Sequence, residues 1–436
     1  TNGGSKAAAS GIATFTNLNH EKSENVYFKA STGGLTVACS NSVIISPAAA
    51  AVLAFTTEPS AAGTAGADLA TQPVVTVQDA FLNTVTASSD SVTLAAFTDS
   101  GCTAGAGGAL SVTTNPLAAS SGVATFAGLD YDTVETVYLK ASSGGLTTDC
   151  SANIVISPAA ASQLVYTTQP SATGTAGVNL AAQPVIEIRD AFDNVATSSS
   201  DTVSLTTYTT ADCSTTSSSG TTNGSSKAAS SGIATFTALN HEKAEATYYK
   251  ASSGGLTTDC STISTISHAG AAQVVFSTEP SATGTAGVDL ATQPVVTVQD
   301  AFANTVLSSS DSVTLAAFTD SGCTSAGGGT LSAITNPLAA SSGVATFAGV
   351  DYTKAENMYL KASSGGLTVA CSSVVDIDPA AADHLAVNTQ PSTTGTAGAD
   401  LSTQPIFDIE DTYNNLVDTA TDNVTIAAYP DVGCTS

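Results

Sequence analysis

The sequence predicts an all-β protein that consists of tandem β-sandwich domains in an elongated rod. Three observations lead to this prediction: a repeat of about 110 residues, short runs in which apolar and polar residues alternate, and turn residues between those runs. The 436 residues allow three or four domains of this size, and each can bury a core of its own. No segment has the apolar spacing of a capped amphipathic helix.

The repeat is defined by the phrase Gly-Thr-Ala-Gly followed by Gln-Pro. The proline of this phrase recurs in steps of 111, 110 and 111 residues, at Pro73, Pro184, Pro294 and Pro405. A second period of 221 residues relates two sets of cysteines, because Cys39, Cys102, Cys150 and Cys213 recur at Cys260, Cys323, Cys371 and Cys434. Two kinds of domain therefore alternate, one with Asn-His-Glu-Lys (residues 19–22 and 240–243) and one with Thr-Asn-Pro-Leu (residues 114–117 and 335–338).

Seven strands are expected in each repeat, because apolar residues occupy every second position, as a strand with one buried face requires. In the repeat that follows residue 48 the expected strands are residues 54–56, 74–78, 91–97, 110–113, 123–126, 137–141 and 153–156. Turns are expected at Gly63 and Gly66 and at residues 79–83, 101–108 and 144–145. The Ala runs 48–51 and 159–161 are short apolar linkers, which should pack against their neighbours and hold the domains in line.

Composition and charge limit the partners. Ten Lys and Arg residues against 36 Asp and Glu residues give a formal charge of −26, which repels nucleic-acid phosphates and anionic membranes. We therefore expect no nucleic-acid partner. No stretch approaches the ~20 consecutive apolar residues of a membrane span, so we expect no membrane insertion by this segment, and signals or anchors are expected outside it.

Two segments resemble the bacterial immunoglobulin-like repeats of large adhesins and surface proteins, the group that includes the invasin and intimin ectodomains. Residues 75–83, Val-Thr-Val-Gln-Asp-Ala-Phe-Leu-Asn, are similar to that family's strand and turn, and versions of them end at Asn194, Asn304 and Asn415. Residues 138–146, Tyr-Leu-Lys-Ala-Ser-Ser-Gly-Gly-Leu, resemble its last hairpin and recur around Tyr27, Tyr248 and Tyr359. The resemblance covers the whole chain. It implies tandem immunoglobulin-like β-sandwich domains of about seven strands, used as spacers or adhesive modules and without catalytic residues.

The expected domain boundaries follow from the repeat. Residues 49–159, 160–270 and 271–380 are three whole immunoglobulin-like repeats. Residues 1–48 match only the C-terminal half of a repeat, and residues 381–436 match only its N-terminal half. Joined end to start, these two segments make one whole domain.

Eight cysteines without Cys-x-x-Cys spacing or accompanying His predict disulfides in an oxidising compartment rather than zinc. Pairing within a domain would join Cys102 to Cys150, Cys213 to Cys260 and Cys323 to Cys371, and each closed loop is worth about 4 kcal/mol in the chain-entropy estimate. The alternative joins neighbouring repeats, Cys39 to Cys102, Cys150 to Cys213 and onward. The first pattern leaves Cys39 and Cys434, which we expect to pair with neighbouring copies in a head-to-tail filament.

Four carboxylates begin the turn that follows the second expected strand of each repeat: Asp79, Asp190, Asp300 and Asp411. Together with the Asn four residues on, each of them offers ligands for Ca²⁺ near a domain joint, which would stiffen the rod. The alternative is that each side chain caps its own turn. We expect no other cofactor.

Four of the nine lysines follow a Tyr by two residues, namely Lys29, Lys140, Lys250 and Lys361. One hypothesis is an isopeptide cross-link from Lys to Asn or Asp. The alternation of the strand predicts instead that Tyr27 and Lys29 face solvent, where a lysine protects a sheet edge and maintains solubility.

The sequence predicts a structural protein and not an enzyme. His20 and His241 share a motif with Glu, but the alternate repeats carry Asp-Tyr at that place, and no nucleophile turn or phosphate-binding glycine loop is present. We expect an extracellular or cell-surface fibre or stalk whose partners are copies of itself. The alternative is an adhesin whose repeats bind a host protein or glycan.

Overall fold

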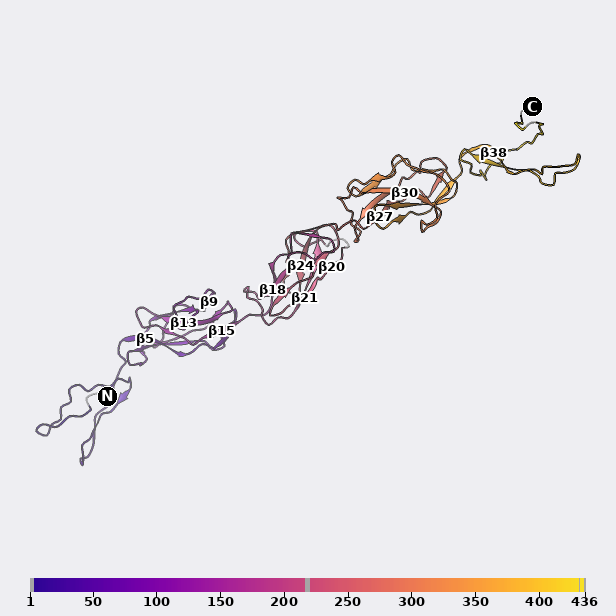
Figure 1. Cartoon of the computed structure of the whole chain (residues 1–436). Helices are drawn as coiled ribbons and strands as arrows, with labels where there is room; N and C mark the ends of the chain where they lie inside the picture. The colour runs from indigo at the N-terminus through magenta and orange to yellow at the C-terminus, as the bar shows by residue number, and fades with distance from the viewer. Residues whose placement is uncertain (1–3, 216–219, 431, 435–436) are drawn as a thin grey trace.

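The computed structural model describes residues 4–215, 220–430 and 432–434. Figure 1 shows three β-sheet bodies strung in one line, with a more open segment at each end. The regular secondary structure of these residues is β-strand throughout, so the all-β prediction is confirmed. The part of the chain described here contains no helix that is long and apolar enough to cross a membrane.

We name the three bodies in Figure 1 by the expected bounds, as domain 1 (residues 49–159), domain 2 (residues 160–270) and domain 3 (residues 271–380). Domain 1 contains β5 (Ala50–Thr57), β6 (Ala62–Thr64), β7 (Val74–Asp79), β8 (Ser91–Phe97), β9 (Leu110–Ser111), β10 (Leu117–Ala118), β11 (Val123–Thr125), β12 (Asp130–Tyr131), β13 (Thr136–Ser142), β14 (Asp149–Cys150) and β15 (Ile154–Ser157). Domain 2 contains β16 (Gln163–Thr168), β17 (Thr173–Thr175), β18 (Val185–Arg189), β19 (Thr202–Tyr208), β20 (Thr222–Asn223), β21 (Ser226–Ala228), β22 (Ile233–Thr235), β23 (Asn240–His241), β24 (Ala246–Ser252), β25 (Asp259–Cys260) and β26 (Ser264–Ser267). Domain 3 contains β27 (Gln273–Thr278), β28 (Thr283–Thr285), β29 (Val295–Gln299), β30 (Ser312–Phe318), β31 (Leu331–Ser332), β32 (Leu338–Ala339), β33 (Val344–Thr346), β34 (Asp351–Tyr352), β35 (Asn357–Ser363), β36 (Ala370–Cys371) and β37 (Val375–Asp378).

The end segments are named here the N-terminal half-domain (residues 1–48) and the C-terminal half-domain (residues 381–436). The first contains β1 (Asn25–Val26), β2 (Lys29–Ala30), β3 (Ala38–Cys39) and β4 (Val43–Ile44). The second contains β38 (Ala382–Thr389) and β39 (Ile406–Asp411).

Each whole domain consists of two sheets with the same strand order. In domain 1 the first sheet has the order β5-β7-β11, and the second has the order β6-β15-β13-β8-β10 with β14 also paired to β13. A short pair, β9 with β12, completes the domain. All of these pairings are antiparallel except that of β6 with β15, which is parallel. The three domains are therefore tandem immunoglobulin-like β-sandwiches.

The core of each domain lies between its two sheets, where the alternating apolar residues meet. In β8, Val92 and Leu94 are buried while Thr93 is exposed. In β13, the neighbouring strand of the same sheet, Leu139 and Ala141 are fully buried, and Val75 and Val77 of β7 are fully buried in the other sheet. Domains 1, 2 and 3 each contain a separate cluster of this kind, so each domain has a core of its own.

All seven strands expected in domain 1 are present, but four others were not expected. These are β6, β10, β12 and β14, each of two or three residues and thus too short to show an alternating pattern. The prediction that Gly63 marks a turn is wrong, because Gly63 lies in β6. An added Cβ there would lie 2.6 Å from Leu69 Cδ2 and 3.0 Å from Ile156 Cδ1, so the glycine is required by close packing.

Candidate functional site: the joint between domains

The turn that follows β18 ties domain 2 to the chain that enters it. The side chain of Asp190 is fully buried, and its Oδ1 accepts hydrogen bonds from the backbone N–H groups of Phe192 and Asn194, both at 2.9 Å. Its Oδ2 accepts a third, from the backbone N–H of Ala159 in the linker, also at 2.9 Å. One carboxylate therefore fixes both the shape of the turn and the position of the linker.

Asn194, at the end of the same turn, bridges the two domains. Its Nδ2 donates to the backbone carbonyl of Asp132 at 2.7 Å, and its Oδ1 accepts from the backbone N–H of Val134 at 2.9 Å. Both partners belong to domain 1. The side-chain amide thus donates one hydrogen bond and accepts another across the joint, as the backbone of a paired strand residue does. Asn194 Nδ2 also lies 3.1 Å from Asp190 Oδ2, which orients the amide.

Phe192, between these two residues, packs against domain 1 at Gly66. A Cβ added to Gly66 would lie only 1.9 Å from Cζ of Phe192, so the ring occupies the space that a side chain there would need. Gly66 has a φ of +66°, which also favours glycine. The backbone N–H of Gly66 donates to the carbonyl of Tyr131, which holds the loop under the ring.

The joint occurs four times with the same Asp and Asn contacts. The buried Asp accepts from its linker N–H in the pairs Asp79 with Ala48, Asp300 with Ala269, and Asp411 with Ala380, each at 2.8 Å. The Asn bridges to the preceding domain in the sets Asn83 with Glu21 O and Ser23 N, Asn304 with Glu242 O and Ala244 N, and Asn415 with Thr353 O and Ala355 N. The aromatic covers a glycine at two further joints, Phe302 on Gly177 and Tyr413 on Gly287.

The joint carboxylates are held ionised. Burial of Asp79 raises its pKa, but hydrogen bonds from the side chain and backbone of Asn83 and from the N–H groups of Ala48 and Phe81 outweigh burial and lower the pKa to about 2. The pKa values of Asp190, Asp300 and Asp411 are lowered from the ordinary value by the same balance, burial opposed by the Asn and backbone donors. The joint is therefore assembled in its charged form at neutral pH.

These contacts match the turn-capping alternative for the four carboxylates. Both oxygens of Asp79 accept hydrogen bonds from N–H donors, so Ca²⁺ binding would require these donors to be displaced. Within residues 4–215, 220–430 and 432–434 there is no group of three or more His, Cys, Asp or Glu residues that could hold a metal ion. Calcium binding at these positions stays a prediction.

A Tyr or a His stands beside each joint and has the same partner in both kinds of domain. The Tyr131 hydroxyl donates to Glu135, and the His241 Nε2 is hydrogen-bonded to Glu245 at 3.0 Å. Tyr131 and His241 are both buried, and each carbonyl accepts from the joint glycine of its domain. Burial and the hydrogen bond with Glu356 raise the pKa of the equivalent Tyr352 to about 12. The alternation of Asp-Tyr with Asn-His therefore preserves a structural hydrogen bond.

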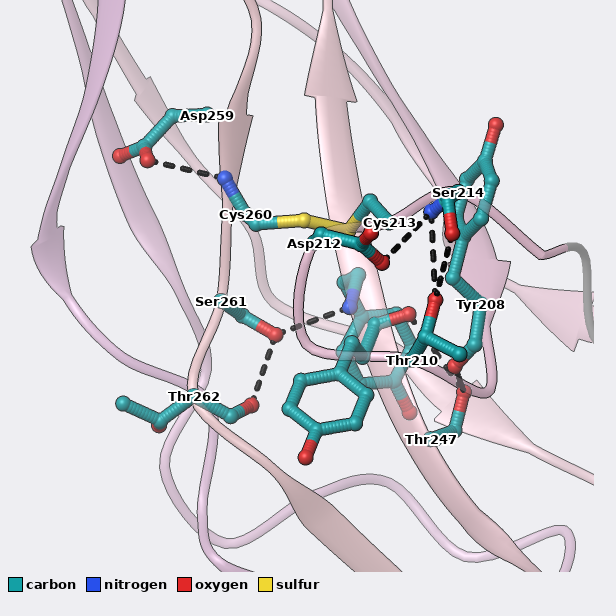
Figure 2. The surroundings of a disulfide bond; sticks show 12 residues. Tyr208, Thr210, Asp212, Cys213, Ser214, Thr247, Asp259, Cys260, Ser261 and Thr262 are labelled. Atoms are coloured by element: carbon teal, nitrogen blue, oxygen red, sulfur yellow. Dashed lines mark hydrogen bonds between the residues drawn. A yellow bond between two sulfur atoms is a disulfide. The ribbon is translucent and has the colours of Figure 1, made fainter.

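Each whole domain contains one disulfide, and the three bonds are those predicted within domains. They join Cys102 to Cys150, Cys213 to Cys260 and Cys323 to Cys371, with Cα–Cα separations of 6.2, 6.3 and 6.1 Å. Figure 2 shows the bond of domain 2, which links the turn after β19 to β25. The alternative pairing between neighbouring repeats is wrong. Cys39 and Cys434 are exposed and form no disulfide with any described residue.

The repeated lysine packs beside the disulfide. Lys140 Nζ lies 5.4 Å from the centroid of the Phe97 ring and 3.4 Å from the backbone carbonyl of Cys102. Lys250 and Lys361 lie over Tyr208 and Phe318 in the same way. The expectation that this lysine protects a sheet edge is wrong for the whole domains, because Lys140 is paired on both sides, with Ala95 of β8 and with Cys150 of β14. The lysine instead covers an aromatic ring of the neighbouring strand.

Sequence reasoning found the Asp and Asn of the joint but missed their role between domains. It also missed the pairing of Phe192 with Gly66, because these residues are 126 positions apart and belong to different domains. A signal was present in the constant spacing, since an aromatic follows the Asp by two residues at Phe81, Phe192, Phe302 and Tyr413.

Comparisons with known proteins give structural likenesses only. No protein-family model matches the chain, and no curated protein matches it. The chain is similar to the I67–I69 I-band fragment from titin, at 14% identity and a TM-score of 0.28 over 76% of this chain and 100% of that one. It is similar to Yersinia pseudotuberculosis InvD, at 15% identity and a TM-score of 0.29 over 74% and 95%. It is also similar to the Y. pseudotuberculosis adhesin InvE, at 17% identity and a TM-score of 0.21 over 49% and 57%.

Proposed function

We propose that this chain is a structural element of an extracellular fibre or stalk, in which immunoglobulin-like domains are held in line by the joint described above. The observation that carries the proposal is the repetition of that joint. Four times, a buried Asp binds the linker, an Asn bridges to the preceding domain, and an aromatic follows between them. A chain whose domains move independently has no need of such contacts.

The joint resists bending because it fixes the linker at separate points. The Asp holds the linker itself, the Asn holds the segment at residues 132–134, and the ring of Phe192 holds the loop at Gly66. A hinge in any direction would have to break at least one of these contacts. Each hydrogen bond contributes about 0.5–1.5 kcal/mol, so the set is large enough to favour one orientation.

An extracellular location is supported by the disulfides and the surface charge. The three domain disulfides persist in oxidising compartments and are rare in the cytosol. The net charge of −26 keeps a long surface protein soluble. The proposed role is mechanical and requires no catalysis. Adhesion through the repeats stays a prediction, and the joint favours the mechanical role.

The proposal is tested by loosening the joints without touching the domain cores. The variant carries Asn194→Ala and Asn304→Ala, and the control carries Asn153→Ala at an exposed position outside the joint. Small-angle scattering of the monomer should show a shorter maximum dimension and a broader distance distribution for the joint variant only. An unchanged profile, with the variant folded, would contradict the proposal.

A further inference from the structure

The linker that enters domain 3 differs in composition from the other three linkers. Residues 46–50 and 157–161 are Ser-Pro-Ala-Ala-Ala, and residues 378–382 are Asp-Pro-Ala-Ala-Ala. Residues 267–271 are Ser-His-Ala-Gly-Ala, so His268 stands in place of the proline and Gly270 in place of the middle alanine. Both exchanges fall within one linker, and both give its backbone more freedom.

A linker proline restricts two residues of the backbone, and His268 restricts neither. Pro158 fixes its own φ at about −65°, and its ring keeps Ser157 out of the helical region. The imidazole of His268 makes two contacts instead: Nδ1 lies 2.8 Å from the carbonyl oxygen of Ala269, and Nε2 lies 3.4 Å from Oγ of Ser308 in domain 3. A separation of 3.4 Å is long for a hydrogen bond, so this contact holds the linker less firmly than a proline ring does.

Gly270 is required neither by close packing nor by its backbone conformation. No atom of the described residues beyond its chain neighbours lies within 4 Å of a Cβ added to it, and its φ is outside the left-handed range. An alanine would therefore fit. The corresponding residues of the other linkers are all alanine: Ala49, Ala160 and Ala381. Glycine at this position thus adds rotational freedom to the linker without serving the fold of either domain.

A groove of about 750 Å³ lies beside this linker, between domains 2 and 3. Ile266 and His268 line it from domain 2, and Asn304 and Leu307 line it from domain 3. Leu307 is 66% exposed on this wall. The same position is polar at the other joints, where it is occupied by Thr86, Thr197 and Asp418. The groove gives the two domains room to approach each other, and Leu307 is the apolar side chain that this approach would cover.

The shared Asp and Asn contacts are present at this joint and limit how far it can bend. The backbone N–H of Ala269 donates to Asp300 Oδ2 at 2.8 Å, and Asn304 keeps both of its hydrogen bonds to domain 2. The two freer residues, His268 and Gly270, lie immediately before and after the anchored Ala269. A small rotation at these two residues therefore tilts domain 3 while Ala269 stays bound.

We infer that the joint between domains 2 and 3 is the compliant joint of the rod. It bends through a limited angle by rotation at His268 and Gly270, and the bend closes the groove and covers Leu307 against domain 2. The inference rests on the proposed function, since it concerns a rod whose other joints are stiff. One compliant joint lets such a rod yield to a sideways load without disturbing the cores of its domains.

The test compares two joints within the same molecule. The 436-residue polypeptide carries C39S and C434S, so that its exposed thiols cannot link molecules, and electron micrographs of single particles give the angle at each joint. The distribution of angles between domains 2 and 3 should be about twofold wider than that between domains 1 and 2. Equal widths at the two joints would overturn the inference. If both distributions were broad, the proposed function would fail as well, whereas two equally narrow distributions would leave it standing.

Exchange of residues between the two linkers assigns the effect. H268P/G270A should narrow the distribution between domains 2 and 3 to the width found between domains 1 and 2. This variant should fold, because the backbone carbonyl before the exchanged residue has the same partner in both linkers: Ser267 accepts from Ala176 as Ser157 accepts from Ala65. The converse variant P158H/A160G should widen the distribution between domains 1 and 2. An unchanged width in H268P/G270A would overturn the inference.

A third variant tests the direction of the bend. The bent particles should lie mainly on the side that closes the groove, because Leu307 is covered there. Leu307→Thr introduces the residue found at Thr197 and should make the bends symmetrical about the straight arrangement, with the width retained. Bends that are symmetrical before this substitution, or that keep their preferred side after it, would overturn the closure of the groove by Leu307.

Discussion

The whole domains and the half-domains carry the same sequence pattern but differ in structure. In domain 2 the segment Ala246–Ser252 is one continuous strand, β24, whereas its counterpart in the N-terminal half-domain contains only the two-residue strands β1 and β2. The difference arises because β24 pairs along its length with β19, which comes from the other half of the repeat. Alternation along a strand therefore forms a sandwich only when both halves are present.

Removal of a disulfide should give the largest difference in stability between the whole domains and the half-domains. The double variant C213S/C260S should lower the free energy of unfolding of domain 2 by about 4 kcal/mol, because the bond closes a loop of 47 residues in the unfolded chain. Hydrogen exchange of the β19 and β24 amides measures the change. C39S is the matched control and should leave the free energy of unfolding of the monomer unchanged, since Cys39 forms no disulfide there.

A core substitution should distinguish the two regions next. Leu205→Ala should destabilise domain 2 by about 2–5 kcal/mol, because the side chain is buried between the sheets. Ile426→Ala, at the equivalent position of the C-terminal half-domain, should change the free energy of unfolding of the monomer by less than about 0.5 kcal/mol. Equal effects in the monomer, measured by hydrogen exchange of the surrounding amides, would show that the half-domain already has a packed core.

Substitution of a joint glycine by alanine should give a smaller difference between the whole domains and the half-domains. Gly66→Ala places a methyl group against the Phe192 ring and should weaken the contact between domains 1 and 2 by about 1–3 kcal/mol. Gly398→Ala has a similar positive φ but no aromatic above it, so only the backbone strain of about 1 kcal/mol is expected. Protection of the Phe192 side chain from surface labelling reports the contact, and equal labelling of Gly66→Ala and the unchanged polypeptide would count against it.

The smallest effect is a pH dependence of the joint. The folded pKa of Asp79 is about 2 and thus below the unfolded value. The stability that the ionised carboxylate gives to the joint is therefore fully present above about pH 4 and is lost as the pH falls towards 2. The lowered pKa values of Asp190, Asp300 and Asp411 act in the same direction. Scattering profiles between pH 7 and 2 should show bending over that range before the domains unfold. Asp190→Asn should remove the dependence at its own joint.

The alternating pattern was sufficient to predict the sandwich fold and seven of the eleven strands of domain 1, and the positions of the cysteines were sufficient to propose the three disulfides. Strands such as β6 and β14 were not predictable, because two or three residues contain no period and their pairing depends on distant strands. In the joint, Asp190 was predictable as a turn cap, since the backbone N–H groups that donate to it lie within four residues. The bridge from Asn194 to Asp132 and the packing of Phe192 on Gly66 join different domains, and local sequence does not encode such contacts.

The angle between neighbouring domains tests the central claim most directly. Electron micrographs of the isolated polypeptide as the C39S/C434S variant, at a concentration that prevents association, allow this angle to be measured for domains 1, 2 and 3 in single particles. The joints predict a narrow distribution around the straight arrangement of Figure 1. A broad distribution of angles, with the domains intact, would contradict the account.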